Sequence, residues 1–388
     1  MLEKQKTLKN ARVGLYIHIP FCIQKCPYCD FYSISNLSLI PDYINALIKE
    51  IQCKASFNQA IDTVYLGGGT PSVLNAYQID HLCQTIFSHF DISQHAEITI
   101  EINPGTISNE KLLSWKSCGI NRVNLGIQSF HDVHLKQLGR IYTSTQAHHA
   151  IDVLYQNNFS NIGIDLMYGI PGQSIDEFET DVHMAINYDL KHLSCYTLSY
   201  EPNTPLFQKI IEKKLIPSTE KTVVQMMASL MNISTDYGFD HYETSNYASS
   251  PSFRSKHNQK YWNLSPYIGL GASAHSYKPD QRSWNVKDIG QYIKMISSNI
   301  DPVSETEQLT QKQKMIEFIF LGLRTSQGIK LDRFEKMFSV CFNDIFSCRL
   351  EQLIADNYVE RTKEACRLTY SGWFYLDSII EQMVNCLE

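Results

Sequence analysis

The strongest constraint on the fold is a regular alternation of short apolar runs and longer helical segments over the first two-thirds of the chain. The apolar runs lie at 15–19, 63–66, 98–102, 123–127, 162–167 and 193–198. The helical segments lie at 42–53, 76–90, 109–118, 143–155 and 175–188. Most apolar runs lack polar alternation, as expected of strands buried on both faces. Six β-then-α units in series predict a parallel sheet, either open or curled into a partial barrel.

Residues beyond about 238 follow a different pattern. The segment 239–300 is rich in Tyr, Asn, Ser and Gly, and we expect a loop-rich extension with short strands there. Helical segments return at 313–324, 331–338, 345–356 and 370–384, with a short hairpin at 357–369. The sequence therefore predicts an α/β protein with the parallel sheet, open or curled into a TIM-like partial (β/α)6 barrel, at 1–238, the extension at 239–300, and a mostly helical, winged-helix-like domain at 301–388.

Composition and charge narrow the functional classes. Of the 388 residues, 43% are hydrophobic, so the chain can bury a sizeable core. Lys and Arg total 34 against 40 Asp and Glu, and the net charge of −6 argues against a nucleic-acid binder. No apolar run of about 20 residues occurs, and residues 1–10 lack the apolar core of a signal peptide. We therefore expect a cytoplasmic protein without a transmembrane segment, and peripheral membrane association stays open.

Three of the 11 cysteines form the most specific motif: Cys22, Cys26 and Cys29, at spacing CxxxCxxC directly after the first apolar run. A [4Fe–4S] cluster has four irons, so three thiolates leave one iron open to another ligand. S-adenosylmethionine offers an amino and a carboxylate group for such an iron, and an electron from the cluster can then cleave its C–S bond. The spacing therefore predicts a [4Fe–4S] cluster that holds S-adenosylmethionine.

Two other interpretations of the same cysteines stay open. Zinc can take the three thiolates together with His18 as a fourth ligand. Cys26 and Cys29 alone, with Pro and Tyr between them, match the redox motif of glutaredoxin-like proteins. A thiol oxidoreductase needs neither Cys22 nor six β–α units, which disfavours the redox interpretation.

Polar or glycine-rich segments follow the later apolar runs, at the strand ends where a barrel enzyme places its chemistry. They contain Gly69 and Thr70 in the run GGGTP, and Glu101, Gln128 and Asp165. Glycine allows close backbone approach to a ligand, and a carboxylate can accept from an amino group or ribose hydroxyls. Taken singly, each residue can also be a satisfied core polar group or part of a tight turn, and Arg140 a solvated surface arginine. Their recurrence at equivalent strand ends favours a shared binding site.

On these motifs, the chain resembles the radical S-adenosylmethionine superfamily, and within it the oxygen-independent coproporphyrinogen III oxidase family. The matching segments are 16–31, 67–71, 101–104, 126–129, 165–173, 242–248, 257–262, 269–277, 322–328 and 368–372, spread over nearly the whole chain. The resemblance implies a radical S-adenosylmethionine partial barrel with the cluster on the three cysteines. It implies a first S-adenosylmethionine bound by Tyr16, Gly69, Thr70 and Glu101. The positions that match a second such site in the oxidase are Tyr28, Gln128, Arg140 and Asp165.

Two features separate the chain from the oxidase. The oxidase has a further cysteine two residues after the cluster triad, where this chain has Phe31, and it has a longer segment before its first strand. Both departures resemble the haem chaperone branch of the family, which binds haem and hands it to acceptor proteins. The run HNQKYW at 257–262 matches the HNxxYW motif of that branch. The resemblance thus implies haem and an acceptor protein as partners, with radical decarboxylation of coproporphyrinogen III as the alternative function.

The HNxxYW motif also has a physical interpretation. Histidine is a common axial ligand of haem iron, so His257 is the candidate haem ligand. Tyr261 and Trp262 can pack on a porphyrin face. The nearby cations Arg254, Lys256 and Lys260 can pair with the propionates. A loop histidine is more often only a hydrogen-bonding residue, and that interpretation stays open.

Overall fold

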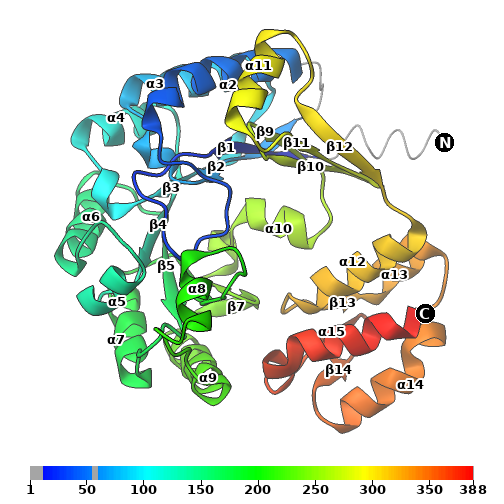
Figure 1. The fold of residues 1–388 in the computed structure, drawn as a ribbon. Coiled ribbons are helices and arrows are strands. Elements are labelled where there is room, and N and C mark those ends of the chain that lie inside the picture. Colours follow the sequence, from blue (N-terminus) through cyan, green and yellow to red (C-terminus); the bar gives the residue numbers. More distant parts are fainter. Residues whose placement is uncertain (1–11, 55–59, 388) are drawn as a thin grey trace.

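The computed structural model of the protein describes residues 12–54 and 60–387. Its centre is a wall of parallel strands, β1 (Val13–Ile19), β2 (Ile61–Gly68), β3 (Ile92–Ile102), β4 (Arg122–Gln128), β5 (Ile162–Tyr168) and β6 (His192–Thr197). The strands pair in chain order, and each overlaps one of the six predicted apolar runs. The predicted parallel sheet is therefore confirmed (Figure 1).

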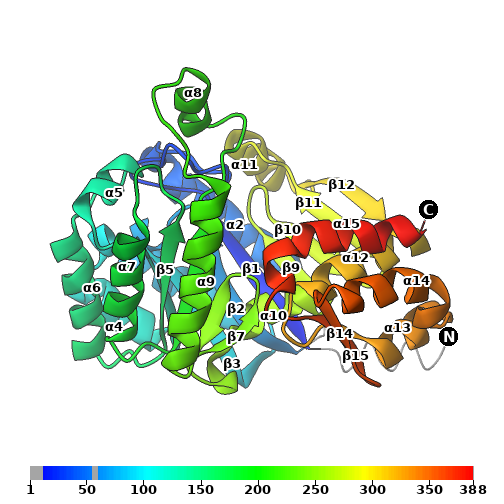
Figure 2. The ribbon, with the colours of Figure 1, turned by 90° about the horizontal axis from the view of Figure 1, so that it is seen from below.

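Helices cover the outer face of this wall (Figures 1 and 2). They are α2 (Ile40–Lys54), α3 (Ala76–His89), α4 (Asn109–Ser117), α5 (Asp132–Gln137), α6 (Ser144–Gln156), α7 (Ile175–Ile186) and α9 (Glu220–Asp236). A further helix, α8 (Pro205–Ile211), projects beyond one end of the wall (Figure 2). The five predicted helices overlap α2, α3, α4, α6 and α7, whereas α5, α8 and α9 lie outside the predicted segments. Short 3-10 helices lie at Leu37–Leu39, Pro71–Val73, Pro104–Thr106, Pro251–Phe253, Gly372–Tyr375 and Asn385–Leu387.

Alternate residues of each strand point either to the helices or into the barrel. In β1, Leu15, Ile17 and Ile19 are fully buried in the apolar core between strands and helices. The residues between them, Tyr16 and His18, therefore point into the barrel. The same alternation on the neighbouring strands makes the interior polar, and this interior holds the predicted site residues.

The segment 239–300 contains more regular structure than its composition predicts. Its strands are β7 (Asp240–Glu243), β8 (Asn246–Ala248), β9 (Tyr267–Leu270), β10 (His275–Lys278) and β11 (Gln281–Asn285), and its helices are α10 (Lys256–Trp262) and α11 (Ile289–Ser297). With β12 (Val303–Gln308), the sheet has 12 strands in the order β12-β11-β10-β9-β1-β2-β3-β4-β5-β6-β8-β7. The end strands β12 and β7 do not pair with each other, so the barrel is partial, as predicted.

The C-terminal part forms a second, smaller core. Its helices are α12 (Gln311–Leu323), α13 (Leu331–Phe338), α14 (Phe342–Ala355) and α15 (Leu376–Val384), and its small sheet contains β13 (Ile329–Lys330), β14 (Val359–Arg361) and β15 (Ala365–Leu368). The four predicted helices and the hairpin, formed by β14 and β15, are confirmed. Phe334, Phe342 and Phe346 are fully buried in this core.

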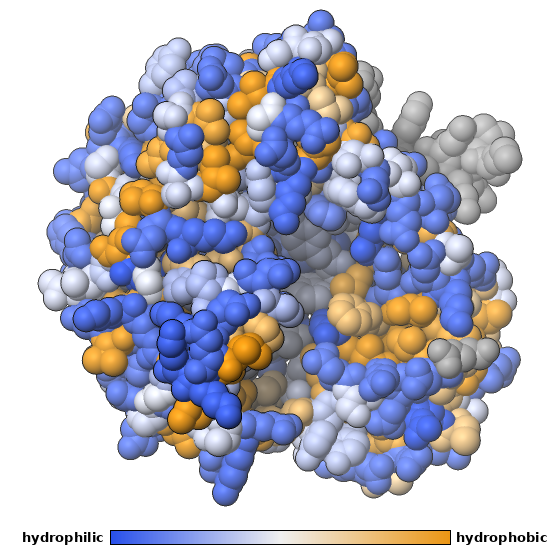
Figure 3. All heavy atoms as spheres, in the orientation of Figure 1, coloured by the Kyte–Doolittle hydropathy of each residue, from blue (hydrophilic) through white to orange (hydrophobic). Residues whose placement is uncertain are grey.

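The C-terminal domain docks against the β7 edge of the barrel. Ser326 N–H donates to the Tyr242 carbonyl at 3.1 Å, and Thr244 N–H donates to the Arg324 carbonyl at 3.0 Å. The surface is hollowed between the two parts (Figure 3). Within the described ranges, no helix is long and apolar enough to cross a membrane. The expectation made for residues 1–10 lies outside those ranges.

Candidate functional site

The three cluster cysteines lie in the loop that follows β1. Phe21 is fully buried and anchors this loop, and Cys22 N–H donates to the Ile34 carbonyl at 3.0 Å. Cys29 N–H donates to the Cys26 carbonyl at 3.1 Å, which places the last two cysteines on one tight turn. All three thiols are free and partly exposed. The loop therefore presents three available thiols at the C-terminal end of the barrel strands.

His18, the fourth ligand in the zinc interpretation, has other partners. Its Nδ1 lies 3.0 Å from the Tyr16 hydroxyl, and its Nε2 lies 3.2 Å from the Tyr32 carbonyl oxygen. Burial lowers the pKa of His18 to about 4. Among the residues that the structure describes, no group of three His, Cys, Asp or Glu side chains is placed to hold a single metal ion. The position of His18 favours the cluster interpretation over zinc.

Glu101 lies near the end of β3, with its carboxylate held inside the barrel. The Tyr65 hydroxyl donates to its Oε1 at 2.8 Å, and Gly68 N–H donates to its Oε2 at 3.1 Å. Desolvation in the barrel raises the pKa of Glu101 to about 7, although both hydrogen bonds oppose this shift. No cation in the described part of the chain forms an ion pair with it. A carboxylate fixed in this way without a counter-ion fits the amino group or ribose hydroxyls of S-adenosylmethionine.

The glycine-rich turn after β2 packs backbone to backbone against the cluster loop. A Cβ on Gly69 would lie 2.8 Å from the Phe21 carbonyl oxygen and 2.9 Å from the Phe21 nitrogen. The Thr70 hydroxyl lies 3.5 Å from Cys22 Sγ and donates to it. A side chain at residue 69 would thus clash with the backbone of Phe21, whether or not a ligand is bound. The turn therefore links the position of Gly69 and Thr70, two residues predicted to bind S-adenosylmethionine, to that of the cysteine loop.

Tyr16 completes the first predicted group. Its ring stacks on Tyr65 at 6.1 Å between centroids, and Tyr65 in turn holds Glu101. Tyr16 and Glu101 therefore lie on the barrel strands β1 and β3, and Gly69 and Thr70 lie in the turn after β2, next to the cysteine loop.

The second predicted group lies on β4, β5 and the loop after α5. Gln128 has φ 73, a conformation that is uncommon for a non-glycine residue and is often found at functional positions. A Cβ on Gly126 would lie 3.1 Å from Gln128 Nε2 and 3.7 Å from Arg140 Nη2, so these two side chains are neighbours. The Arg140 guanidinium lies 6.0 Å from the centroid of the Tyr28 ring. Arg140 is therefore not a solvated surface arginine.

Asp165 joins this second group through its charge. Asn124 Nδ2 donates to both of its carboxylate oxygens at 2.9 Å. Desolvation raises the pKa of Asp165 to about 6, whereas these hydrogen bonds and the Arg140 charge act to lower it. A pocket lined by Cys26, Thr70 and Arg140, among others, connects the two predicted groups.

The HNxxYW motif forms α10 and closes the other end of the barrel. His257 is 1% exposed, with Nδ1 2.8 Å from the Thr63 hydroxyl and Nε2 3.0 Å from the Tyr261 hydroxyl. Its backbone N–H donates to Glu97 at 3.1 Å. Thr63 pairs with Glu97 near the start of the β2–β3 ladder, away from the cluster loop. Haem ligation by His257 stays a prediction, and it requires the imidazole to give up one of these two hydroxyl partners.

Two of the three cations near the motif already have acidic partners. Lys260 Nζ lies 2.6 Å from Asp62, and Arg254 Nε donates to Asp240 at 2.7 Å. Lys256 is exposed. Lys260 and Arg254 therefore stabilise the position of α10, and a haem propionate would compete with existing ion pairs there.

Two supporting residues were not among those predicted from the sequence. Tyr65 holds Glu101, and Asn124 holds Asp165. Their positions in the sequence could have identified both residues. Each is a polar residue within an apolar run, two residues before a glycine that also faces the barrel interior.

Comparisons with known proteins give two family matches. The chain matches the Radical SAM superfamily over residues 16–185 and the HemN C-terminal domain over residues 309–375. The solved structure of coproporphyrinogen III oxidase (HemN) from Escherichia coli aligns with a TM-score of 0.84 at 21% identity, covering 97% of this chain and 90% of that one. This similarity confirms the fold.

Curated relatives identify the family more closely. The protein named heme chaperone HemW of Lactococcus lactis is 33% identical over 372 residues, covering 95% of this chain and 96% of its own length. The protein of the same name from Bacillus subtilis is 33% identical over 362 residues, covering 92% of this chain and 95% of its own. The chain therefore belongs to the HemW family within the radical SAM superfamily.

Proposed function

We propose that this protein is a haem chaperone, which binds haem and transfers it to acceptor proteins. The observation that carries the proposal is the near-full-length similarity to proteins named heme chaperone HemW, at 33% identity over 95% of the chain. In this proposal the barrel at 1–238 carries the cluster, the extension at 239–300 carries the HNxxYW motif, and the domain at 301–388 lies beside that motif. We place the transfer in the cytoplasm and expect no role for nucleic acid.

The cofactors of the proposal are a [4Fe–4S] cluster on Cys22, Cys26 and Cys29, S-adenosylmethionine and haem. The free, partly exposed thiols suit the cluster, and the fixed carboxylate of Glu101 suits S-adenosylmethionine. When bound, the cluster supplies an open iron and an electron to this ligand. The chain's own contribution is to hold Glu101 through Tyr65 and Gly68 and to keep the turn at Gly69 against the cluster loop.

The oxidase alternative has less support at the cluster loop. Phe31, at the position where the oxidase has a further cysteine, is 72% exposed. An exposed phenylalanine supplies neither a thiol nor a proton there. We therefore propose that the chain does not oxidise coproporphyrinogen III.

Haem transfer can be tested directly with anaerobically reconstituted full-length protein. Titration should saturate near one haem per chain, and addition of apomyoglobin should move the haem, with the Soret band following the transfer. Bovine serum albumin preloaded with haem serves as the control donor. Weak, nonsaturable uptake, or transfer no faster than from albumin, would contradict the proposed function.

A further inference from the structure

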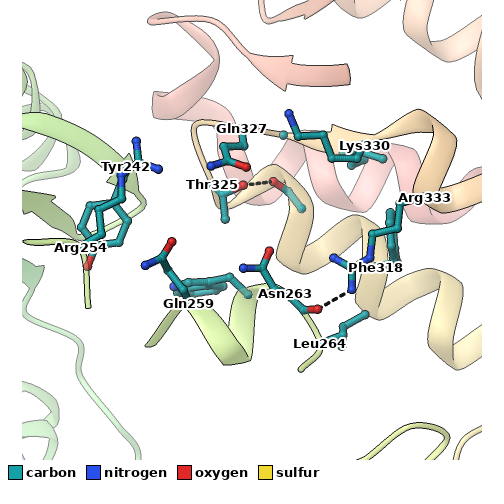
Figure 4. Close-up of a pocket in the computed structure, with 14 residues that line it drawn as sticks. Tyr242, Arg254, Gln259, Asn263, Leu264, Phe318, Thr325, Gln327, Lys330 and Arg333 are labelled. Atoms are coloured by element: carbon teal, nitrogen blue, oxygen red, sulfur yellow. Dashed lines mark hydrogen bonds between the residues drawn. The ribbon is translucent and has the colours of Figure 1, made fainter. Parts of the chain in front are cut away.

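A pocket lies between α10 and the C-terminal domain. The residues of α10 that contact the barrel are His257, Lys260 and Tyr261, whereas Gln259, Trp262 and Asn263 line this pocket. These two sets fall on different faces of the helix, because residues three and four apart share a face. In Figure 4, Gln259 and Asn263 face Thr325 and Gln327 across the pocket. The motif helix therefore presents one face to the barrel and another to this pocket.

All charged side chains that line the pocket are positive. Its lining contains Arg254, Lys330 and Arg333 but no Asp or Glu, in a chain whose net charge is −6. Arg254 is paired with Asp240, and Arg333 Nη2 donates to the Asn263 carbonyl at 2.5 Å. Lys330 has no side-chain partner within the ranges that the structure describes. The pocket therefore offers an uncompensated positive charge to an anion.

The rest of the lining suits a carboxylate attached to a flat, apolar body. Trp262 and Phe318 supply aromatic surface, and the Arg333 guanidinium lies 5.4 Å from the centroid of the Phe318 ring.

We infer that this pocket binds a carboxylate arm of an amphipathic anion, which is one propionate of haem if the proposed function holds. The cavity volume of about 60 Å³ has room for such an arm and excludes the macrocycle. The macrocycle would lie outside, where the surface is hollowed between the barrel and the C-terminal domain (Figure 3). Lys330, the lining cation without a side-chain partner in the described ranges, is the donor for the carboxylate oxygens. The inference is independent of which residue ligates the iron.

Haem titrations of Lys330 variants test the inference. Lys330→Gln should raise the haem dissociation constant by about fivefold, the effect of losing one partly exposed ion pair, and Lys330→Glu should raise it further by like-charge repulsion. Lys336→Gln is the matched control, because Lys336 lies on α13, six residues after Lys330, is 78% exposed and does not line the pocket. It should leave the haem dissociation constant unchanged.

Haem dimethyl ester, whose propionates carry no charge, separates charge recognition from packing. The parent should bind the ester more weakly than haem, and the three lysine variants should bind it as the parent does. The inference is overturned if Lys330→Gln and Lys336→Gln bind haem with the same dissociation constant. It is also overturned if Lys330→Gln weakens binding of the ester as much as it weakens binding of haem. If the parent itself takes up no haem saturably, the proposed function fails, which is a different outcome from saturable binding that ignores Lys330.

Discussion

Replacing His257 with Ala tests whether α10 closes the barrel through this histidine. The change removes the partner of the Thr63 hydroxyl, at 2.8 Å, and of the Tyr261 hydroxyl, at 3.0 Å. Leaving a buried polar group unsatisfied costs about 1–3 kcal/mol, so we expect the free energy of unfolding to fall by about 2–4 kcal/mol at neutral pH.

The pKa of His257 gives this loss a characteristic pH dependence. Burial lowers the pKa to about 3, whereas a histidine in the unfolded chain binds a proton near about 6.5. Below that pH the unfolded state holds a proton that the folded state does not, so His257 favours unfolding by about 1.4 kcal/mol more for each pH unit. The alanine variant lacks this contribution. The stability difference between parent and variant should therefore narrow by about 2 kcal/mol from pH 6.5 to about pH 5.

Urea denaturation followed by circular dichroism at several pH values measures both effects. His149→Ala is the matched control, because His149 is exposed on α6, and its unfolding free energy should stay within about 0.5 kcal/mol of the parent. Hydrogen exchange of α10 should also become faster in the His257 variant. A variant as stable as the parent at neutral pH, or a stability difference that does not change with pH, would refute the reasoning.

Four further predictions concern the cluster end of the barrel. Replacing any one of the three cluster cysteines with Ala should abolish the iron content and brown colour of reconstituted protein, whereas Cys195→Ala, which changes a 2% exposed core residue, should keep both. Gly69→Ala should weaken S-adenosylmethionine binding at least about tenfold by calorimetry, because its Cβ would lie within 3.0 Å of Phe21 backbone atoms. The pKa of Glu101 is about 7, so S-adenosylmethionine affinity should fall by up to about tenfold per pH unit below that value, and Glu101→Gln should remove the dependence. Anaerobic assays should yield no protoporphyrinogen from coproporphyrinogen III, and multiple turnovers would overrule the argument from Phe31.

The barrel could be predicted from the sequence because its strands are buried on both faces. A run such as 162–167 contains mostly apolar residues, and every residue of β5 except the partly buried Asp165 is buried. The helices are marked in the sequence by capping residues as well as by apolar periodicity. A capping box of Ser174 and Glu177 begins α7, and Gly119, with φ 71, follows α4.

The extension at 239–300 could not be predicted as well, because its elements are short and their buried faces are polar. The strands from β7 to β11 contain three to five residues each, too few to show a pattern. In α10 the buried side chains are His257 and Lys260, which are held by hydrogen bonds and an ion pair. Apolar periodicity therefore does not predict this helix, which is held in place by its contacts with the barrel.

The candidate site was predictable to the extent that strand ends meet at one edge of a parallel sheet. That rule brings Glu101, Gln128 and Asp165 to the cluster loop. The rule does not identify Tyr65 and Asn124, which hold the carboxylates of Glu101 and Asp165 by hydrogen bonds between neighbouring strands. It also misses the reason for Gly69, since the contact with Phe21 depends on how two loops pack.

The two ends of the barrel are joined by a short chain of contacts. His257 binds Glu97 through its backbone, and Glu101 lies four residues further along β3, about 13 Å at the rise of a β-strand. Tyr65 spans this distance: its ring stacks on His257 at 5.1 Å between centroids, and its hydroxyl donates to Glu101 at 2.8 Å. Tyr65 therefore contacts both His257 of the HNxxYW helix and Glu101, the predicted partner of S-adenosylmethionine. In this geometry, the HNxxYW motif and the predicted S-adenosylmethionine site lie at two ends of one packed interior.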